Sequence, residues 1–284
     1  MRLGYANIVV DLSSFKIVGS CEIMTATLLS EKNPLLKQVR RAVARGSLTE
    51  DGFAIAESFH LLEEALASDC EIGAVIAAES VKSAVAAHVR GLKRMRVVAV
   101  PDAIFEQLAS TEHTQGVIAL VRPPAWTLDQ LLRGKPLMVV LDGVQDPGNA
   151  GTIVRACEAF GGTGAAFLKG SVGPYNPKTL RASAGSLFRL PVVAGADEDL
   201  LLAALDHKRI SLYAATPRAT KSIADANFSE RCAIVIGSEG RGVSPTLAER
   251  ATPVRIPTTR VESLNAAVAA GILLYEARRQ RASS

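Results

Sequence analysis

The chain has 284 residues, of which 48% are hydrophobic and 21% are charged, and its net charge is +4. This composition is typical of a globular protein with room for two domains, and no apolar run reaches the roughly 18 residues that a membrane span requires. The longest apolar run, residues 264–275, is interrupted by Asn265 and favours a buried helix. The basic excess lies in residues 124–284, with 19 Lys and Arg against 14 Asp and Glu, and suits a polyanionic partner.

The cysteines and histidines are scattered along the chain. The absence of a CxxC pair argues against a zinc site or a disulfide framework and favours a reducing cytoplasm. The histidines are equally far apart, so we expect no metal centre. The residues concerned are Cys21, Cys70, Cys157 and Cys232, and His60, His88, His113 and His207.

Residues 1–29 are interpreted as an N-terminal extension. The first 23 residues lack the basic start, the apolar core and the cleavage site of a signal peptide. Met24 then opens MTATLLSEKNPLLKQVRRAVARG, which is typical of the start of a domain. An upstream start codon chosen in error and a genuine extension both fit this pattern.

Residues 30–122 are predicted to form a small α/β domain. Apolar residues at helical spacing indicate a helix over 33–46, and short strands and helices alternate after it. The strands are expected over 52–58, 71–78, 95–101 and 116–121, and the helices over 60–68, 83–91 and 102–110. Two adjacent prolines make residues 122–126 the best linker.

Residues 123–284 alternate again and predict a second α/β domain. The segment 136–144 is rich in β-branched and apolar residues, as a parallel strand buried on both faces is. Further strands are expected over 164–168, 210–217, 232–240 and 252–258. Helices are expected from Asn149 to residue 162, over 176–188 and over 263–281.

Three stretches place polar residues or glycines at the carboxyl ends of predicted strands, where an open parallel sheet binds ligands. In the first, DPGNAGTIVRACEAFG, we expect Asn149 to cap the helix. Arg155 follows on one stripe with Thr152 and Glu158. A capped surface helix with an Arg155–Glu158 pair is the alternative interpretation.

The second stretch, IVIGSEGRG, follows a buried strand, and its glycines allow the backbone to approach a ligand closely. The spacing is G-x-x-G-x-G and no GK[ST] follows, so neither the dinucleotide fingerprint nor the P-loop fits. A tight turn with a solvated Glu239 is the alternative.

The third stretch, VRIPTTRVESLNAAVAAGILLYEA, leads into the closing helix. We expect Ser263 to cap this helix and Asn265 to fall within it. A helix that is apolar all round must be buried, either under the sheet or in a subunit interface. Asn265 at its buried front then needs partners, which a ligand or a structural hydrogen-bond network would supply.

Together these stretches resemble motifs one, two and three of the SpoU (TrmH-type) branch of the SPOUT methyltransferases, in family order and at family-like separations. The intervening NPKTLRASAGSLFRLPV is also similar to the family. Residues 30–122, with SEKNPLLKQVRRA and STEHTQGVIALV, resemble the ribosomal-protein-like RNA-binding domain that often precedes it. Relatives usually carry Glu-Gly where this chain has Glu57-Ser58, a departure that concerns the detail of RNA contact there.

The resemblance implies an α/β fold in which the C-terminal domain has a parallel sheet and a deep trefoil knot. It also implies S-adenosylmethionine as the methyl donor, a homodimer through the C-terminal domain, and transfer to a ribose 2′-hydroxyl of RNA. The matching active-site positions are Asn149, Arg155, Glu239, Ser263 and Asn265. The cofactor positions that it implies are Ala215, Thr216, Gly237, Gly242, Ile256, Pro257, Leu264 and Asn265.

A ribose hydroxyl is a poor nucleophile, so it must be aligned and relieved of its proton. Arginine stays charged in proteins. We therefore expect Arg155 to clamp the RNA phosphate and hydroxyl and to stabilise the developing alkoxide, with a substrate phosphate as the proton acceptor. Asn149 and Glu239 are expected to orient Arg155 and the ribose, while Ser263 and Asn265 shape the pocket.

The N-terminal domain favours 23S ribosomal RNA as the substrate, by analogy with relatives that carry it. Its basic segments KQVRRAVAR and RGLKRMR are expected to hold a stem-loop, from which a flipped-out nucleotide enters the catalytic domain. A tRNA ribose methyltransferase and a non-catalytic RNA-binding or ribosome-assembly protein are the alternatives. An enzyme that protects ribosomes from an antibiotic stays open as well.

Overall fold

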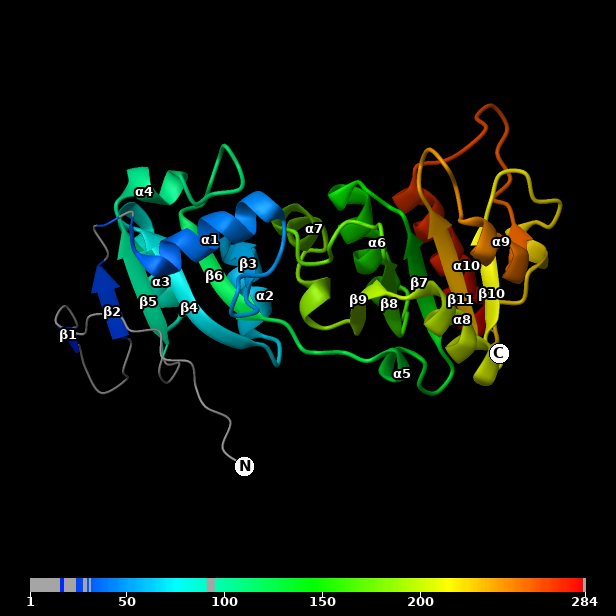
Figure 1. The fold of residues 1–284 in the computed structure, drawn as a ribbon, viewed down its shortest axis with the longest axis horizontal. Coiled ribbons are helices and arrows are strands. Elements are labelled where there is room, and N and C mark those ends of the chain that lie inside the picture. Colours follow the sequence, from blue (N-terminus) through cyan, green and yellow to red (C-terminus); the bar gives the residue numbers. More distant parts are fainter. Residues whose placement is uncertain (1–15, 18–23, 28–29, 31, 91–94, 283–284) are drawn as a thin grey trace.

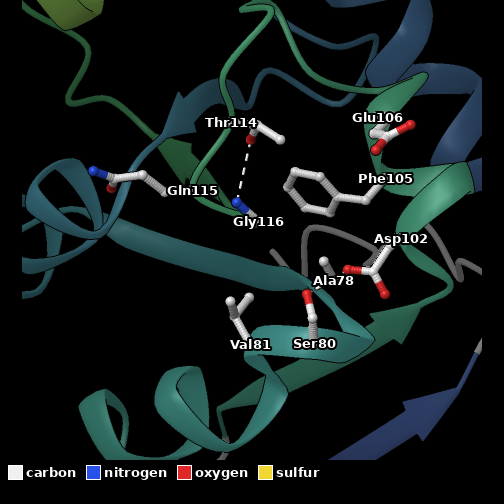
Figure 2. A pocket seen from close by; sticks show the side chains of 9 residues that line it. All are labelled: Ala78, Ser80, Val81, Asp102, Phe105, Glu106, Thr114, Gln115 and Gly116. Atoms are coloured by element: carbon white, nitrogen blue, oxygen red, sulfur yellow. Dashed lines mark hydrogen bonds between the residues drawn. The ribbon is translucent and has the colours of Figure 1, made fainter.

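The computed structural model describes residues 16–17, 24–27, 30, 32–90 and 95–282, and these residues form two α/β domains (Figure 1). The N-terminal and C-terminal domains lie side by side, with helix α7 (Pro177–Ala182) of the second domain next to the first. Met1–Ile23, Cys21 included, lie outside the described residues apart from 16–17. The same is true of residues 91–94 in the second basic segment.

The N-terminal domain is built on a mixed sheet of order β1-β2-β5-β4-β6-β3. Strands β2, β5 and β4 run parallel, whereas β6 pairs antiparallel with both β4 and β3. The sheet includes β1 and β2, which both lie within residues 1–29, the predicted N-terminal extension. The strands are β1 (Lys16–Ile17), β2 (Met24–Thr27), β3 (Ala54–Glu57), β4 (Glu71–Ala78), β5 (Arg96–Val100) and β6 (Val117–Arg122).

Helices cover both faces of this sheet. Helices α1 and α4 bury their apolar residues on one face, and α2 and α3 bury theirs on the other. Helix α1 begins after Asn33, whose side chain accepts a hydrogen bond from the Leu35 N–H, and ends at Gly46 with φ 60°. The helices are α1 (Pro34–Arg45), α2 (Phe59–Leu66), α3 (Lys82–His88) and α4 (Asp102–Glu106), with a 3-10 turn at Glu79–Val81.

The C-terminal domain is built on a six-stranded sheet of order β12-β10-β11-β7-β8-β9. All five strand pairs are parallel, as the doubly buried apolar runs predicted. The strands are β7 (Leu137–Asp142), β8 (Gly164–Leu168), β9 (Val192–Ala196), β10 (Ser211–Ala215), β11 (Cys232–Gly237) and β12 (Thr252–Val254). The trefoil knot that the resemblance implies is not decided by this strand order and stays a prediction.

Helices α6 and α10 pack on one face of the second sheet, and α5, α8 and α9 pack on the other. Their bounds are α5 (Leu128–Leu131), α6 (Pro147–Ala159), α8 (Glu198–His207), α9 (Pro245–Arg250) and α10 (Ala266–Ala282), with 3-10 turns at Ser186–Phe188 and Ile223–Asp225. The continuous helix expected over 176–188 is wrong. Helix α7 stops at Ala182, because Ala184 and Gly185 adopt positive φ angles of 48° and 88° before the turn at Ser186–Phe188.

No helix in the described part of the chain is long and apolar enough to cross a membrane. The same residues contain no group of three or more His, Cys, Asp or Glu side chains placed to hold a metal ion. Cys70, Cys157 and Cys232 are free thiols.

Candidate active site

The three stretches singled out from the sequence meet at one edge of the C-terminal sheet. Strands β12, β10, β11 and β7 are neighbours and parallel, so their carboxyl ends lie at the same edge. The register places Ala215 opposite Val254 and Gly237 opposite Asp142. Open parallel sheets bind ligands at this edge. The fold therefore brings together the ends of strands that are far apart in sequence.

Glu239 stands on a short closed loop after β11. The backbone groups of Ser238 and Gly242 bond each other in both directions, at 3.0 and 2.9 Å. A Cβ on Gly237 would lie 2.2–2.4 Å from backbone atoms of Gly242 and Val243. The loop can fold back this tightly only because Gly237 has no side chain. The result is an exposed carboxylate on a constrained loop.

The predicted cap of α6 is wrong, and the error explains how Asn149 becomes available. The cap is Asp146, whose carboxylate accepts a hydrogen bond from the Asn149 N–H at 2.6 Å. Pro147 follows at the first helical position, where its missing N–H costs nothing. Asn149 therefore lies in the first turn with its amide side chain free to bond elsewhere.

The predicted cap of α10 is also wrong, because the true cap comes after the predicted residue, whereas in α6 it comes before. Asn265, not Ser263, caps this helix: its Oδ1 accepts hydrogen bonds from the N–H groups of Ala267 and Val268 at 2.9 and 3.2 Å. Ser263 is exposed on the preceding loop and makes no hydrogen bond within the described chain. Asn265 thus lies at the mouth of the helix and keeps its Nδ2 for a second partner.

A directed chain of hydrogen bonds joins the three motifs. Asn265 Nδ2 donates to Asn149 Oδ1 at 2.9 Å, and Asn149 Nδ2 donates to Glu239 Oε1 at 2.6 Å. The direction is fixed, because Asn265 Oδ1 is already used by the helix and an ionised carboxylate can only accept. Each motif of the sequence contributes one member, and together they hold the Glu239 carboxylate in place.

Arg155 lies on the same helix as Asn149 but outside this chain. Its side chain is exposed and makes no hydrogen bond or ion pair with any described residue. Asn149 and Glu239 therefore do not orient it as expected, since they bond each other. The alternative Arg155–Glu158 pair is also absent, because Glu158 bonds Arg189 at 2.7 and 3.0 Å. Arg155 is left as an exposed cation beside the site.

The expected cofactor positions lie on the loops of this edge. Ala215 ends β10, and the Thr216 N–H donates to the Val254 carbonyl at 2.9 Å, which joins the loops after β10 and β12. Ile256 and Leu264 are half-buried and apolar. Pro257 and Gly242 are exposed, the latter with φ 72°. The set combines half-buried apolar side chains with backbone polar groups of the strand ends.

Three residues that the sequence does not single out, Ser244, Asp142 and Glu198, brace the Glu239 loop. The Ser244 N–H donates to Asp142 Oδ2 at 2.6 Å, and the Ser244 hydroxyl donates to Glu198 at 2.9 Å. These bonds tie the chain after the loop to the end of β7 and to α8. The available signal was the position of Asp142, a charged residue directly after five apolar ones.

At the Glu57-Ser58 pair, where relatives usually carry Glu-Gly, the structure shows a buried carboxylate. The Glu57 side chain is only 3% exposed and lies at the junction of the two domains. Ser58 next to it has φ 145°, a backbone conformation that favours glycine, which gives a physical reason for the Glu-Gly pair expected at this place.

Comparisons with known proteins identify the family of each domain. Residues 136–275 match the SpoU rRNA Methylase family, and residues 33–119 match the MRM3-like substrate binding domain. An uncharacterised tRNA/rRNA methyltransferase of Synechocystis is 36% identical over 264 residues, which are 90% of this chain and 94% of that protein. This chain belongs to the SpoU methylase family.

Relatives within the SpoU family include RlmP of Bacillus subtilis, a 23S rRNA guanosine 2′-O-methyltransferase. It is 28% identical over 88% of this chain and 98% of its own length. The SpoU methyltransferase AviRb of Streptomyces viridochromogenes, solved in complex with AdoMet, superposes with a TM-score of 0.80 at 26% identity. The match covers 89% of this chain and 100% of AviRb. The likeness extends over both domains.

Proposed function

We propose that this protein transfers a methyl group from S-adenosylmethionine to a ribose 2′-hydroxyl of 23S ribosomal RNA. The observation that carries the proposal is the hydrogen-bonded chain Asn265–Asn149–Glu239, which joins three motifs at the ligand-binding edge of a parallel sheet. RlmP is named for ribose methylation of 23S rRNA, and AviRb was solved with AdoMet. A protein that only bound RNA would have no need for these linked hydrogen bonds.

The residues at the carboxyl edge fit S-adenosylmethionine. Ile256 and Leu264 offer half-buried apolar surface for the adenine of the cofactor. The backbone at the strand ends, at Ala215 and Gly237, offers polar groups for the other parts of the cofactor. Gly242 and Pro257 border the same loops. When bound, the cofactor supplies an electrophilic methyl group on a sulfonium.

Arg155 is proposed to meet the RNA. A free, exposed guanidinium can form a bidentate pair of hydrogen bonds with a phosphate. It can also stabilise the alkoxide that develops as the ribose hydroxyl loses its proton. A substrate phosphate is the proposed proton acceptor. Glu239, held by Asn149, would position the ribose by accepting a hydrogen bond from it. Ser263, exposed and uncommitted, would border the pocket from the loop before α10.

A homodimer through the C-terminal domain is the proposed assembly. Helix α10 buries one side against the sheet but leaves Val268 and Tyr275 more than half exposed, at 51% and 57%. Ile272 lies between them at helical spacing. An apolar stripe of this kind on a helix whose other side is buried suits a two-fold contact. The proposed place of action is the cytoplasm, and the proposed target is a stem-loop.

The experiment that tests the function is methyl transfer to unmodified 23S ribosomal RNA made by transcription. Wild-type protein should label the RNA from methyl-labelled S-adenosylmethionine, and Arg155→Ala should abolish labelling while calorimetric cofactor affinity stays within a few fold. Arg133→Ala is the matched control, since Arg133 is an exposed arginine of the same domain on the loop after α5. Loss of cofactor binding in Arg155→Ala would contradict its assignment to the RNA. No labelling by the wild type of either 23S RNA or tRNA would contradict the function.

A further inference from the structure

The junction between the domains contains a buried carboxylate. Glu57, the last residue of β3, is 3% exposed, and a buried charge must be met by hydrogen bonds or an opposite charge. Within its own domain it accepts hydrogen bonds from the Ser110 N–H and the Thr111 hydroxyl, both at 2.8 Å. These groups are neutral. The compensating charge has to come from elsewhere.

That charge comes from the catalytic domain. Arg181 of α7 lies with Nη1 3.4 Å from Glu57 Oε2, and the same nitrogen donates to the Ser110 hydroxyl at 2.6 Å. The Arg181 side chain is 27% exposed. The ion pair is therefore largely shielded from solvent, and it crosses the domain junction.

Other contacts cross the same junction. Arg189 donates hydrogen bonds to Glu64 of α2 and to Glu158 of α6. These bonds, chiefly those to Glu158, raise the pKa of Arg189 despite its partial burial. The Cys70 thiol donates to the Phe188 carbonyl at 3.7 Å. A Cβ on Gly185 would lie 2.6 Å from the Glu64 Cβ, so the two backbones approach closely.

The apolar core is continuous across the junction as well. One buried cluster runs from Leu61 and Leu62 of α2 to Leu180, Leu187 and Phe188 of the catalytic domain. Domains joined only by a linker would be expected to move independently. A shared core with a shielded ion pair instead sets one relative orientation.

Helix α7 connects this junction directly to the active site. It packs against α6 so closely that a Cβ on Gly151 would lie 2.3 Å from the Thr179 carbonyl oxygen. Gly151 stands between Asn149 and Arg155 on α6. Arg181 therefore belongs to a helix that contacts both the RNA-binding domain and the helix of the active site.

We propose that Arg181 is a positioning residue for methyl transfer. By pairing with Glu57 it fixes the N-terminal domain relative to α6, so that RNA held by that domain meets Asn149 and Arg155 in one register. A buried ion pair adds little net stability, because desolvation of both charges offsets their attraction, but it favours one geometry. The proposal rests on the proposed function, because it takes RNA to be bound across both domains.

The test compares Arg181→Met with Thr111→Val. Both remove one partner of the Glu57 carboxylate, but only the first partner lies in the other domain. Two substrates are used: unmodified 23S ribosomal RNA, and a short stem-loop that contains the target nucleotide in unmethylated form and does not reach the N-terminal domain. Arg181→Lys, which keeps the charge, serves as the milder variant if Arg181→Met folds poorly.

Arg181→Met should lower kcat on the 23S RNA by on the order of 10- to 100-fold, because misplacement of reacting groups by about 1 Å can cost that much. Its KM, its cofactor affinity and its kcat on the short stem-loop should stay within a few fold of wild type. Arg181→Lys should recover part of the loss, and Thr111→Val should behave as wild type. An equal drop on both RNAs would mean a merely structural role and would overturn the proposal.

Small-angle X-ray scattering of the free protein gives a readout that is independent of activity. Arg181→Met should broaden the distance distribution relative to wild type and Thr111→Val. If the wild type methylates neither RNA, the proposed function fails. The scattering then decides by itself whether Arg181 fixes the relative placement of the two domains. An unchanged distance distribution in Arg181→Met would show that it does not and would overturn the proposal.

Discussion

Replacing Gly151 by alanine should separate α6 from α7 and destabilise the protein. A Cβ at this position would lie 2.3 Å from the Thr179 carbonyl oxygen, 2.6 Å from the Ala182 Cβ and 2.8 Å from the Ser183 nitrogen. Two of these are backbone atoms, which cannot rotate away. The steric cost is therefore about 3 kcal/mol, the upper end of the usual range for overpacked cores. Alanine's greater helix propensity returns about 1 kcal/mol. The expected net loss in the free energy of unfolding is about 2 kcal/mol.

The assay is thermal and urea unfolding of Gly151→Ala beside Thr152→Ala. For a chain of 284 residues, ~2 kcal/mol corresponds to a fall in Tm of roughly 3–4 °C. Thr152 is exposed on the same helix, so its replacement by alanine should leave Tm unchanged or raise it slightly. A Tm for Gly151→Ala at or above the wild-type value would refute the close packing of α6 on α7.

Three further results are expected. Ser58 caps α2 by accepting a hydrogen bond from the Leu61 N–H at 3.1 Å, but its φ of 145° favours glycine. In urea unfolding, Ser58→Gly should therefore be more stable than Ser58→Ala by about 1–2 kcal/mol. Equal stability of the two variants would contradict the backbone strain at this position. Burial raises the pKa of the Cys157 thiol from 9.0 to about 12, so the stability that the neutral thiol contributes is complete below pH 9.0 and is lost as the pH rises toward 12. Cys157→Ala should therefore lose less Tm than wild type between these values, and an identical alkaline decline would argue against the shift. Light scattering should give the mass of a dimer at micromolar concentration, and Tyr275→Glu should shift it toward a monomer; a monomeric wild type would contradict the interface proposed on α10.

Much of the fold could be predicted because its strands carry strong local signals. The segments that became β7, β8 and β11 are short apolar runs, and these runs alone indicate buried parallel strands. Strand β7 ends at Asp142 and β11 ends at Gly237. Strand β9 was missed because it lies at the sheet edge, where Ala194 and Gly195 are exposed and leave no apolar pattern.

The members of the site could be placed from the motifs, but their bonding could not. Asp146 and Asn149 are both good capping residues and lie three positions apart, and the Asp-Pro pair that decides between them also fits an ordinary turn. Once Asp146 takes the cap, Asn149 becomes available for Glu239. The Glu57–Arg181 pair joins residues 124 positions apart in different domains, a contact that no local pattern encodes.

The central claim is methylation of one ribose in 23S ribosomal RNA, and its most direct test is to map 2′-O-methyl groups in total RNA from cells with and without the gene. The account predicts that a single 2′-O-methyl group of 23S RNA disappears in the deletion strain. Purified protein should restore it in vitro, and a 2′-deoxy nucleotide at that position should stop the reaction outright. Transfer that persists on the 2′-deoxy substrate, or a lost mark that lies on a base, would contradict the account.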